Sequence, residues 1–233
     1  LRTQGFTACD ADPYLYTKID AKGNRMTVLM YVDDMLYASN SSDMKNEFEA
    51  AISTTFDVKL MGEAHHYLGL LIRVGEAVGE IFIDQQAKIE QFLHTHGFYN
   101  DLDEITLTPP SQASPFISTV KLTKEQSPQD DDEREALATN KRTRRIEQYR
   151  NILGGLIYFS IGTRPDIAHA VSTVAKFAAN PGREHLRALE KICDYLKARP
   201  EKGILYKKNG ETSRDVLHAY SDASWAEETD SRR

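Results

Sequence analysis

The sequence predicts an α+β protein, because strand-like runs and helical periodicities occupy different stretches of its 233 residues. Three helical patterns follow one another between residues 146 and 200. No internal repeat is visible. The expected strands share β-branched or aromatic composition and nearby turn residues, and they cover 14–19, 26–32, 35–38, 68–74, 81–83, 203–207 and 216–221.

The first three strands are expected to follow one another closely. Residues 14–19 and 26–32 are joined by a turn around Gly23, and residues 35–38 continue as the third strand. The run at 26–32 is apolar without alternation, which is typical of a strand covered on both faces. A hairpin is therefore expected between the second and third strands.

Two helices are expected in the first hundred residues. Ser41 or Ser42 caps the first helix, whose buried positions recur every four residues: Met44, Phe48, Ile52 and Phe56. Asp84 caps the second, which ends at Gly97 and has the buried stripe Ile89, Phe92, Leu93 and His96.

A change of composition follows at Pro109, Pro110 and Pro115. Residues 118–145 are polar and charged, include Asp130-Asp131-Asp132 and offer few core candidates. This composition favours a mobile linker.

Three helices are expected after the linker. The first covers about 146–160, and the third carries Leu189, Ile192, Cys193 and Leu196 and stops before Pro200. The second begins with Thr163 as cap, Pro165 in the first turn and Asp166 as the capping-box acid. Its stripe is Ile167, Val171, Val174 and Ala178. Strands 203–207 and 216–221 are then expected to pair across Asn209-Gly210.

The charge is unevenly distributed along the chain. The net charge is -6, but the stretch from Lys141 to Lys208 holds 15 Lys and Arg against 6 Asp and Glu. A basic block inside an acidic chain indicates a polyanion partner, although solvated helix faces would give the same pattern. Two cysteines without a metal or disulfide spacing favour a reducing compartment. No apolar run reaches the roughly 20 residues of a membrane span, so no membrane partner is expected.

The sharpest candidate site is the pair Asp33 and Asp34, which lies between Val32 and Met35 in an apolar stretch. Adjacent carboxylates repel each other unless one is protonated or a cation joins them. Oxygen ligands suit Mg²⁺, and two-metal phosphoryl transfer uses a shared carboxylate site. An Asp-Asp pair alone is weak evidence for a metal site, because most such pairs are ordinary turns. An aromatic residue two positions before the pair, with apolar strands on both sides, is a stronger pattern.

Other candidate residues favour structural roles. His65-His66 and His94-x-His96 could be read as metal ligands. His96, however, falls on an apolar helix stripe, where a half-buried histidine with its own hydrogen-bond partner is expected. Cys193 also falls on a buried stripe. Gly154-Gly155 lies in a helical pattern and lacks the ending of a phosphate loop.

The helix near 146–160 has two faces. Its core face is expected to hold Tyr149, Ile152, Leu153, Leu156, Ile157 and Ser160. Gly154 and Tyr158 fall nearly opposite, and an outward glycine inside a helix costs about 1 kcal/mol relative to alanine. Close approach of another backbone to Gly154 would explain a glycine at this outward position. Tight helix packing around Gly154 with a half-buried Tyr158 is the alternative.

The motifs together resemble a known family. The run MTVLMYVDDMLYASN resembles the catalytic hairpin of reverse transcriptases from copia-type long-terminal-repeat retrotransposons. In the family's order, four further segments resemble the strand before the hairpin, the primer-grip segment, a downstream block and the opening strand of ribonuclease H: GFTACDADPYLY, MGEAHHYLGLLI, YRNILGGLIYFSIGTRPDIAHAVSTVAKF and YSDASW.

This resemblance implies a domain arrangement. Residues 1–110 would form the C-terminal part of a polymerase palm with the YVDD hairpin and a primer-grip-like hairpin, and 111–145 a polar linker. Residues 146–200 would be thumb- or connection-like helices, and 201–233 the truncated start of a ribonuclease H domain.

The resemblance also implies site residues. Asp33 and Asp34 would be metal-binding catalytic carboxylates of the polymerase, and Asp222 would be the first carboxylate of ribonuclease H. Gly154 and Tyr158 would contact the primer–template duplex. Further ligands of both sites would lie outside the chain, so the chain alone is expected to lack both activities.

The implied function is RNA-directed DNA synthesis by two-metal nucleotidyl transfer with Mg²⁺ or Mn²⁺. The expected partners are an RNA or DNA primer–template, deoxynucleoside triphosphates and the remainder of a Pol polyprotein. The expected location is the cytoplasm, in virus-like particles, with nuclear entry of the parent element. One alternative is a catalytically dead transposon remnant that still binds nucleic acid. The other is a structural module with an accidental Asp-Asp turn.

Overall fold

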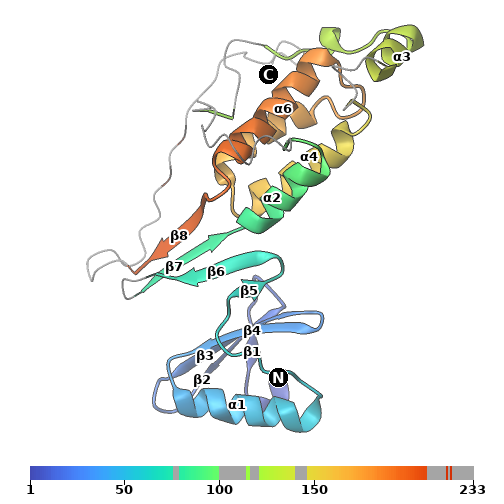
Figure 1. Cartoon of the computed structure of the whole chain (residues 1–233). Helices are drawn as coiled ribbons and strands as arrows, with labels where there is room; N and C mark the ends of the chain where they lie inside the picture. Colours follow the sequence, from blue (N-terminus) through green and yellow to red (C-terminus); the bar gives the residue numbers. More distant parts are fainter. Residues whose placement is uncertain are drawn as a thin grey trace. The chain divides into compact units, whose positions relative to one another are not determined.

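The computed structural model describes residues 1–75, 79–99, 114–115, 121–139, 146–208, 219 and 221. The chain forms two compact units, Leu1–Tyr67 and Leu68–Arg233 (Figure 1). Helices and antiparallel strands occur in both units, so the predicted α+β class is confirmed. None of the helices within the described ranges is long and apolar enough to cross a membrane.

The first unit is an antiparallel sheet with one helix packed on it. The strands are paired in the order β1-β2-β3-β4, and α1 lies along the sheet in Figure 1. The unit's elements are η1 (Arg2–Gln4), β1 (Thr7–Ala8), β2 (Leu15–Ile19), β3 (Arg25–Tyr31), β4 (Asp34–Ser39), α1 (Ser42–Thr55) and β5 (His66–Tyr67).

The core of this unit lies between α1 and the sheet, and its buried residues are Phe6, Met26, Val28, Met44, Phe48 and Ile52. Ser41 caps α1 as predicted, because its side chain accepts a hydrogen bond from the backbone N–H of Met44. The expectation that Phe56 is buried is wrong. The helix ends at Thr55 and Phe56 is extended, so its side chain is 64% exposed.

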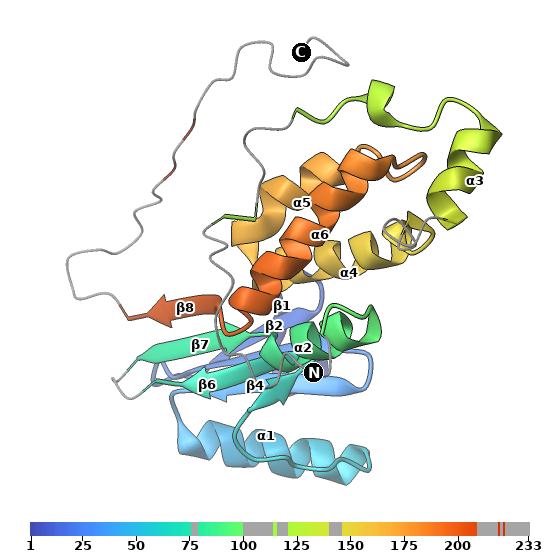
Figure 2. The ribbon, with the colours of Figure 1, turned by 45° about the horizontal axis from the view of Figure 1, so that its top comes forward.

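The second unit combines a small sheet with a helical bundle (Figure 2). Its elements are β6 (Leu70–Val74), β7 (Glu80–Asp84), α2 (Gln86–Thr95), η2 (Lys124–Gln126), α3 (Asp131–Thr139), α4 (Tyr149–Gly162), η4 (Pro165–Ile167), α5 (Ala168–Ala175), α6 (Arg183–Ala198) and β8 (Gly203–Lys207). Helices α2, α4, α5 and α6 share one apolar core.

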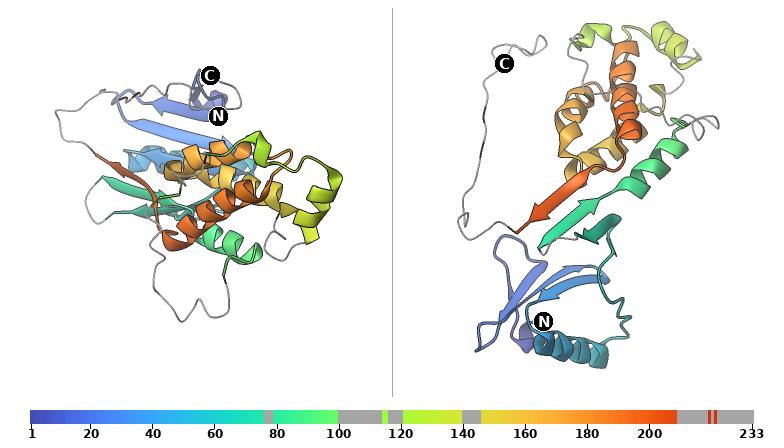
Figure 3. Two further views of the ribbon diagram at one scale, coloured as in Figure 1. Left: turned by 90° about the horizontal axis from the view of Figure 1, so that it is seen from above. Right: turned by 60° about the vertical axis from the view of Figure 1, so that its left-hand side comes forward.

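Strand β8 joins two distant stretches of chain. It pairs antiparallel with β7, Ile204 facing Ile83 and Tyr206 facing Ile81, and the two strands lie side by side in Figure 3. The strand predicted at 203–207 is therefore confirmed, and its partner in the structure is β7. The predicted partner strand, 216–221, lies outside the described residues except for Ala219 and Ser221.

The predicted stripes of the bundle are largely confirmed. Tyr149, Ile152, Leu153 and Leu156 of α4 and Leu189, Ile192, Cys193 and Leu196 of α6 are buried. Ile157 was expected on the core face but is 38% exposed, and Phe159 is buried in its place. The core covers the side of α4 that carries Phe159. The Phe159 ring meets the Phe92 ring of α2 edge-on, with the ring centroids 5.3 Å apart.

Part of the expected linker at 118–145 is helical, which corrects that interpretation for 124–126 and 131–139. Asp130 accepts a hydrogen bond from the backbone N–H of Glu133, and three acids occupy the first turn of α3. Negative side chains at a helix N-terminus stabilise it through the helix dipole. The acidic run is thus a helix start, which its scarcity of apolar residues concealed.

Candidate functional site

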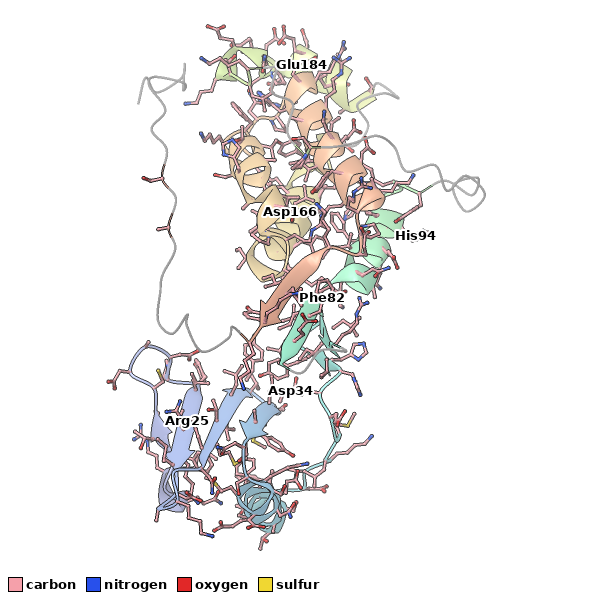
Figure 4. All side chains as sticks on the ribbon, turned by 90° about the vertical axis from the view of Figure 1, so that its left-hand side faces the viewer. Arg25, Asp34, Phe82, His94, Asp166 and Glu184 are labelled. Carbon is pink, nitrogen blue, oxygen red and sulfur yellow. The ribbon has the colours of Figure 1, made fainter. Side chains whose placement is uncertain are left out.

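The Asp33-Asp34 pair occupies the tip of a tight hairpin. Tyr31 on β3 pairs with Asp34 on β4, so only Val32 and Asp33 form the turn. Both carboxylates are exposed, Val32 is 80% exposed and Tyr31 is 56% exposed. Figure 4 shows the position of Asp34. The predicted hairpin is confirmed, and it presents two adjacent carboxylates to solvent.

The turn is strained at Val32. Its φ is 52°, in the left-handed region that β-branched residues rarely adopt. Tight hairpin turns require a positive φ at the first central position and usually place glycine there. Strain of about 1–3 kcal/mol is typically retained where the surroundings over-determine it, and such positions cluster at functional sites.

Tyr67 is a neighbour of this site that the sequence did not indicate. Its hydroxyl is shielded from solvent and has no hydrogen-bond partner in the described part of the chain. Burial, followed by the charge of the Asp34 carboxylate, raises the pKa of Tyr67. The motif around Tyr67 was recognised only by resemblance, because a lone tyrosine carries no spacing signal.

A metal ion at the hairpin would need more ligands than these two. Among the described residues, no group of three or more His, Cys, Asp or Glu is placed to hold a metal ion. Two carboxylates suit a hard cation such as Mg²⁺, which binds one or two protein carboxylates and completes its shell with water and phosphate. The donor set therefore fits part of a divalent-cation site.

Gly154 and Tyr158 share the exposed face of α4. Space around a Cβ at Gly154 is open, with no described heavy atom within 4 Å. The close backbone approach expected there is thus absent from the described residues, and the tight packing belongs to Gly155, where a Cβ would collide with the Phe92 ring. Tyr158 is 47% exposed.

The segment Thr163–Asp166 forms a hydrogen-bond network around one buried arginine, and Asp166 lies at its exposed edge. Arg164 is fully buried, and its Nε and Nη2 donate to the two oxygens of Asp166 at 3.0 and 2.9 Å. Its Nη1 donates to the Arg199 carbonyl at 2.9 Å, and the Tyr195 hydroxyl donates to Asp166 at 2.8 Å. This network joins η4 to the end of α6.

The predicted capping at this segment is partly wrong. Pro165 occupies the first helical turn as predicted, but the residue before it, Arg164, is the N-cap. The Thr163 hydroxyl donates to the Gln85 side chain at 3.0 Å, and Asp166 binds Arg164. The partner of Thr163 lies 78 residues away in sequence, whereas Asp166 binds a residue two positions before it.

Part of the basic block is used within the fold. Arg150 donates to the Ala178 carbonyl, three residues after α5, at 2.8 Å, and Lys197 donates to the Phe98 carbonyl at 3.0 Å. Lys207 pairs with Glu80 at 2.8 Å. Together with buried Arg164, four of the fifteen basic side chains of this block are thus engaged within the fold.

The histidine candidates are exposed or packed against aromatic rings. His96 is half buried and its ring packs edge-on against Phe92 at 4.7 Å, while His94 stacks on Tyr99 at 4.3 Å. Both have neighbours that explain them without a metal. Asp222, the proposed ribonuclease H carboxylate, lies outside the described residues.

Comparison with known proteins decides the family. Residues 1–108, which contain the strained hairpin, match the family described as reverse transcriptase (RNA-dependent DNA polymerase). This stretch is similar to reverse transcriptases. The enzyme class is thus reverse-transcriptase-like by resemblance, and the predicted relationship to copia-type elements is confirmed.

Relatives extend the similarity over the whole chain. The retrovirus-related Pol polyprotein from transposon TNT 1-94 of Nicotiana tabacum is 29% identical over 100% of the chain, which covers 16% of that protein. The corresponding protein from transposon RE1 of Arabidopsis thaliana is 32% identical over 99% of the chain, which covers 14% of it.

A third relative is much shorter. An uncharacterized mitochondrial protein of Arabidopsis thaliana is 28% identical over 89% of the chain, which spans 75% of that protein. No solved structure matches the chain. The chain thus spans less than a fifth of the two Pol polyproteins and most of the mitochondrial relative.

Proposed function

We propose that this chain is part of the polymerase of a retrotransposon Pol polyprotein and supports template-directed DNA synthesis on RNA or DNA. One observation carries the proposal: the reverse-transcriptase-like stretch folds into a strained hairpin whose tip exposes Asp33 and Asp34. The substrates would be deoxynucleoside triphosphates and a primer–template. The location would be the cytoplasm, within virus-like particles.

The role of the two aspartates follows from their chemistry. Their carboxylates would provide oxygen ligands for Mg²⁺ or Mn²⁺, with further ligands supplied from outside the described residues. Such ions, when bound, activate the primer 3'-hydroxyl and stabilise the leaving pyrophosphate. The hairpin's contribution is to hold both carboxylates in fixed positions, since phosphoryl transfer depends on positioning and electrostatics.

The test is Asp33→Asn in a polymerase that contains this chain. Loss of a metal ligand should reduce primer extension by at least about 100-fold, because several kcal/mol of transition-state stabilisation disappear. Asp57→Asn removes an equally exposed carboxylate of the same unit and should change little. Extension by the Asp33 variant within about tenfold of the parent, with normal folding, would refute the assignment.

The exposed face of α4 would contact the primer–template duplex. Its support is the open surface at Gly154 and the half-exposed Tyr158 ring, which offers a flat apolar surface to a sugar or base edge. Gly154→Glu should weaken duplex binding at least about tenfold by adding bulk and negative charge, whereas Ser172→Glu at an exposed position of α5 should not. Equal effects of the two variants on binding would remove the proposal.

A ribonuclease H domain beginning near Asp222 remains part of this proposal. The segment YSDASW carries it by resemblance alone. The test is an RNA–DNA hybrid cleavage assay of a longer polyprotein fragment with Asp222→Asn, which should abolish cleavage while primer extension continues. Undiminished cleavage would exclude Asp222 from that site.

A further inference from the structure

A second strained turn lies between β5 and β6. Its two residues, Leu68 and Gly69, both have positive φ, 50° and 82°. Glycine adopts this conformation freely, but a leucine does so at a cost because its Cβ crowds the backbone. Leu68 is also 40% exposed, so burial of its own side chain does not compensate fully. Another contact is needed to hold the turn.

Tyr158 of α4 supplies that contact. Its hydroxyl donates a hydrogen bond of 3.2 Å to the Leu68 carbonyl, across ninety residues of sequence. A Cβ at Gly69 would lie 3.0 Å from the same hydroxyl and 3.4 Å from Cε of Lys88. The turn therefore sits against Tyr158 and Lys88, and a Cβ at Gly69 would push the ends of these side chains away.

The two ends of Tyr158 face different surroundings. The hydroxyl binds the turn, whereas the side chain remains 47% exposed. Neighbouring Ile161 on the same helix is 80% exposed. The ring meets the adjacent Phe159 edge-on, with centroids 5.6 Å apart, and the hydroxyl makes the contact to the turn.

We propose that Tyr158 is a positioning residue whose hydroxyl latches α4 to the Leu68–Gly69 turn and so fixes the turn for the primer terminus. The inference rests on the proposed polymerase function, because the segment 61–72 that contains the turn resembles the primer-grip segment. It adds a role that differs from duplex contact by the ring. The latch would couple the helix bundle to the placement of the primer.

The first experiment uses the 233-residue chain and Tyr158→Phe, which removes the hydroxyl and keeps the ring. Peptide-level hydrogen exchange across residues 66–74 should accelerate about threefold to tenfold, the effect of losing one net hydrogen bond. Tyr206→Phe changes a 55% exposed tyrosine of β8 and should leave this peptide unaffected. Unchanged exchange in the Tyr158 variant would overturn the latch.

The second experiment tests coupling between the two sides of the latch. Gly69→Ala and Gly23→Ala both place alanine at a φ of 82°, but only Gly69 has neighbours within 4 Å. Exchange of the turn should accelerate in Gly69→Ala alone. In the double variant with Tyr158→Phe the effects should be less than additive, because either change already breaks the contact. Full additivity would contradict the latch.

The third experiment separates positioning from folding in a polymerase that contains this chain. Tyr158→Phe should lower kcat for nucleotide addition about tenfold and leave duplex affinity unchanged, because the ring remains. Tyr158→Ala should lower both. A lower melting temperature with unchanged kcat would make the contact merely structural and overturn the proposal. A parent polymerase that extends no primer would refute the proposed function, whereas unchanged exchange would refute the latch, so the two failures are distinguishable.

Discussion

Two motifs with aspartates, Tyr31–Asp34 and Thr163–Asp166, differ in almost every physical respect. The first lies at an exposed hairpin tip with strained backbone, and its carboxylates face solvent. The second is built around a fully buried arginine whose guanidinium binds Asp166 and a distant carbonyl. Both stand out in the sequence, yet the first is suited to binding a ligand and the second to holding the fold. Burial and hydrogen-bond partners separate the two roles.

The largest loss of stability is expected from Arg164→Ala in the buried motif. Removing the fully buried Arg164 side chain leaves the Arg199 carbonyl without this donor and Asp166 with only its Tyr195 donor among those described above, which should cost the second unit about 3 kcal/mol of unfolding free energy. Thermal and denaturant unfolding of the chain measures the loss, with Arg183→Ala at an exposed position as control. A change below about 1 kcal/mol would contradict a structural role.

A smaller effect is expected from Asp166→Asn, and it should depend on pH. Burial alone would raise the pKa of Asp166, but the hydrogen bond and charge of Arg164, helped by Tyr195 and Lys202, outweigh it and lower the pKa. The ionised carboxylate therefore stabilises the fold above about pH 4, and this contribution is lost as pH falls through the lowered pKa.

The measurement compares unfolding of the parent and the Asp166→Asn variant between pH 7 and pH 3. At pH 7 the variant should be about 2 kcal/mol less stable, the scale of hydrogen bonds to a charged group. The difference should shrink below about pH 4. Asp57→Asn should show no such convergence, since Asp57 is exposed. A constant difference across the range would exclude the ion pair as its cause.

The smallest effect is expected from Val32→Gly at the exposed motif. Relief of strain at a φ of 52° exceeds the entropy that glycine adds to the unfolded chain, so the first unit should gain about 1 kcal/mol. Extension by the polymerase should nevertheless fall severalfold, because a freer turn holds Asp33 and Asp34 less rigidly. Val74→Gly, on a regular strand position, should destabilise instead. A Val32 variant with lower stability would show that the turn is not strained.

Sequence reasoning succeeded where structure is local. The Asp33-Asp34 hairpin, the Ser41 cap and the α6 stripe depend on neighbours within a few residues, and all three are confirmed. Helical spacing also placed Gly154 and Tyr158 on an exposed face.

Sequence reasoning failed where long-range partners decide. The α4 face was assigned to Ile157 instead of Phe159, because the position of α2 beside Phe159 is not encoded in the spacing of α4. The role of Thr163 depends on Gln85, and that of Tyr158 on Leu68, each separated by more than seventy residues. Helix α3 was missed for another reason, since its stability comes from acids at its start and it buries no residue.

The pairing of β8 with β7 has a consequence for the order of events during protein synthesis. The first unit has all its strands within the first 67 residues and can assemble soon after they leave the ribosome. Strand β7 can pair with β6 at once, but its other edge must wait until β8, more than a hundred residues later, has been translated. During that interval this edge is exposed to other nascent chains. Translation pausing after β8 would favour correct folding, whereas release before β8 would leave an aggregation-prone product.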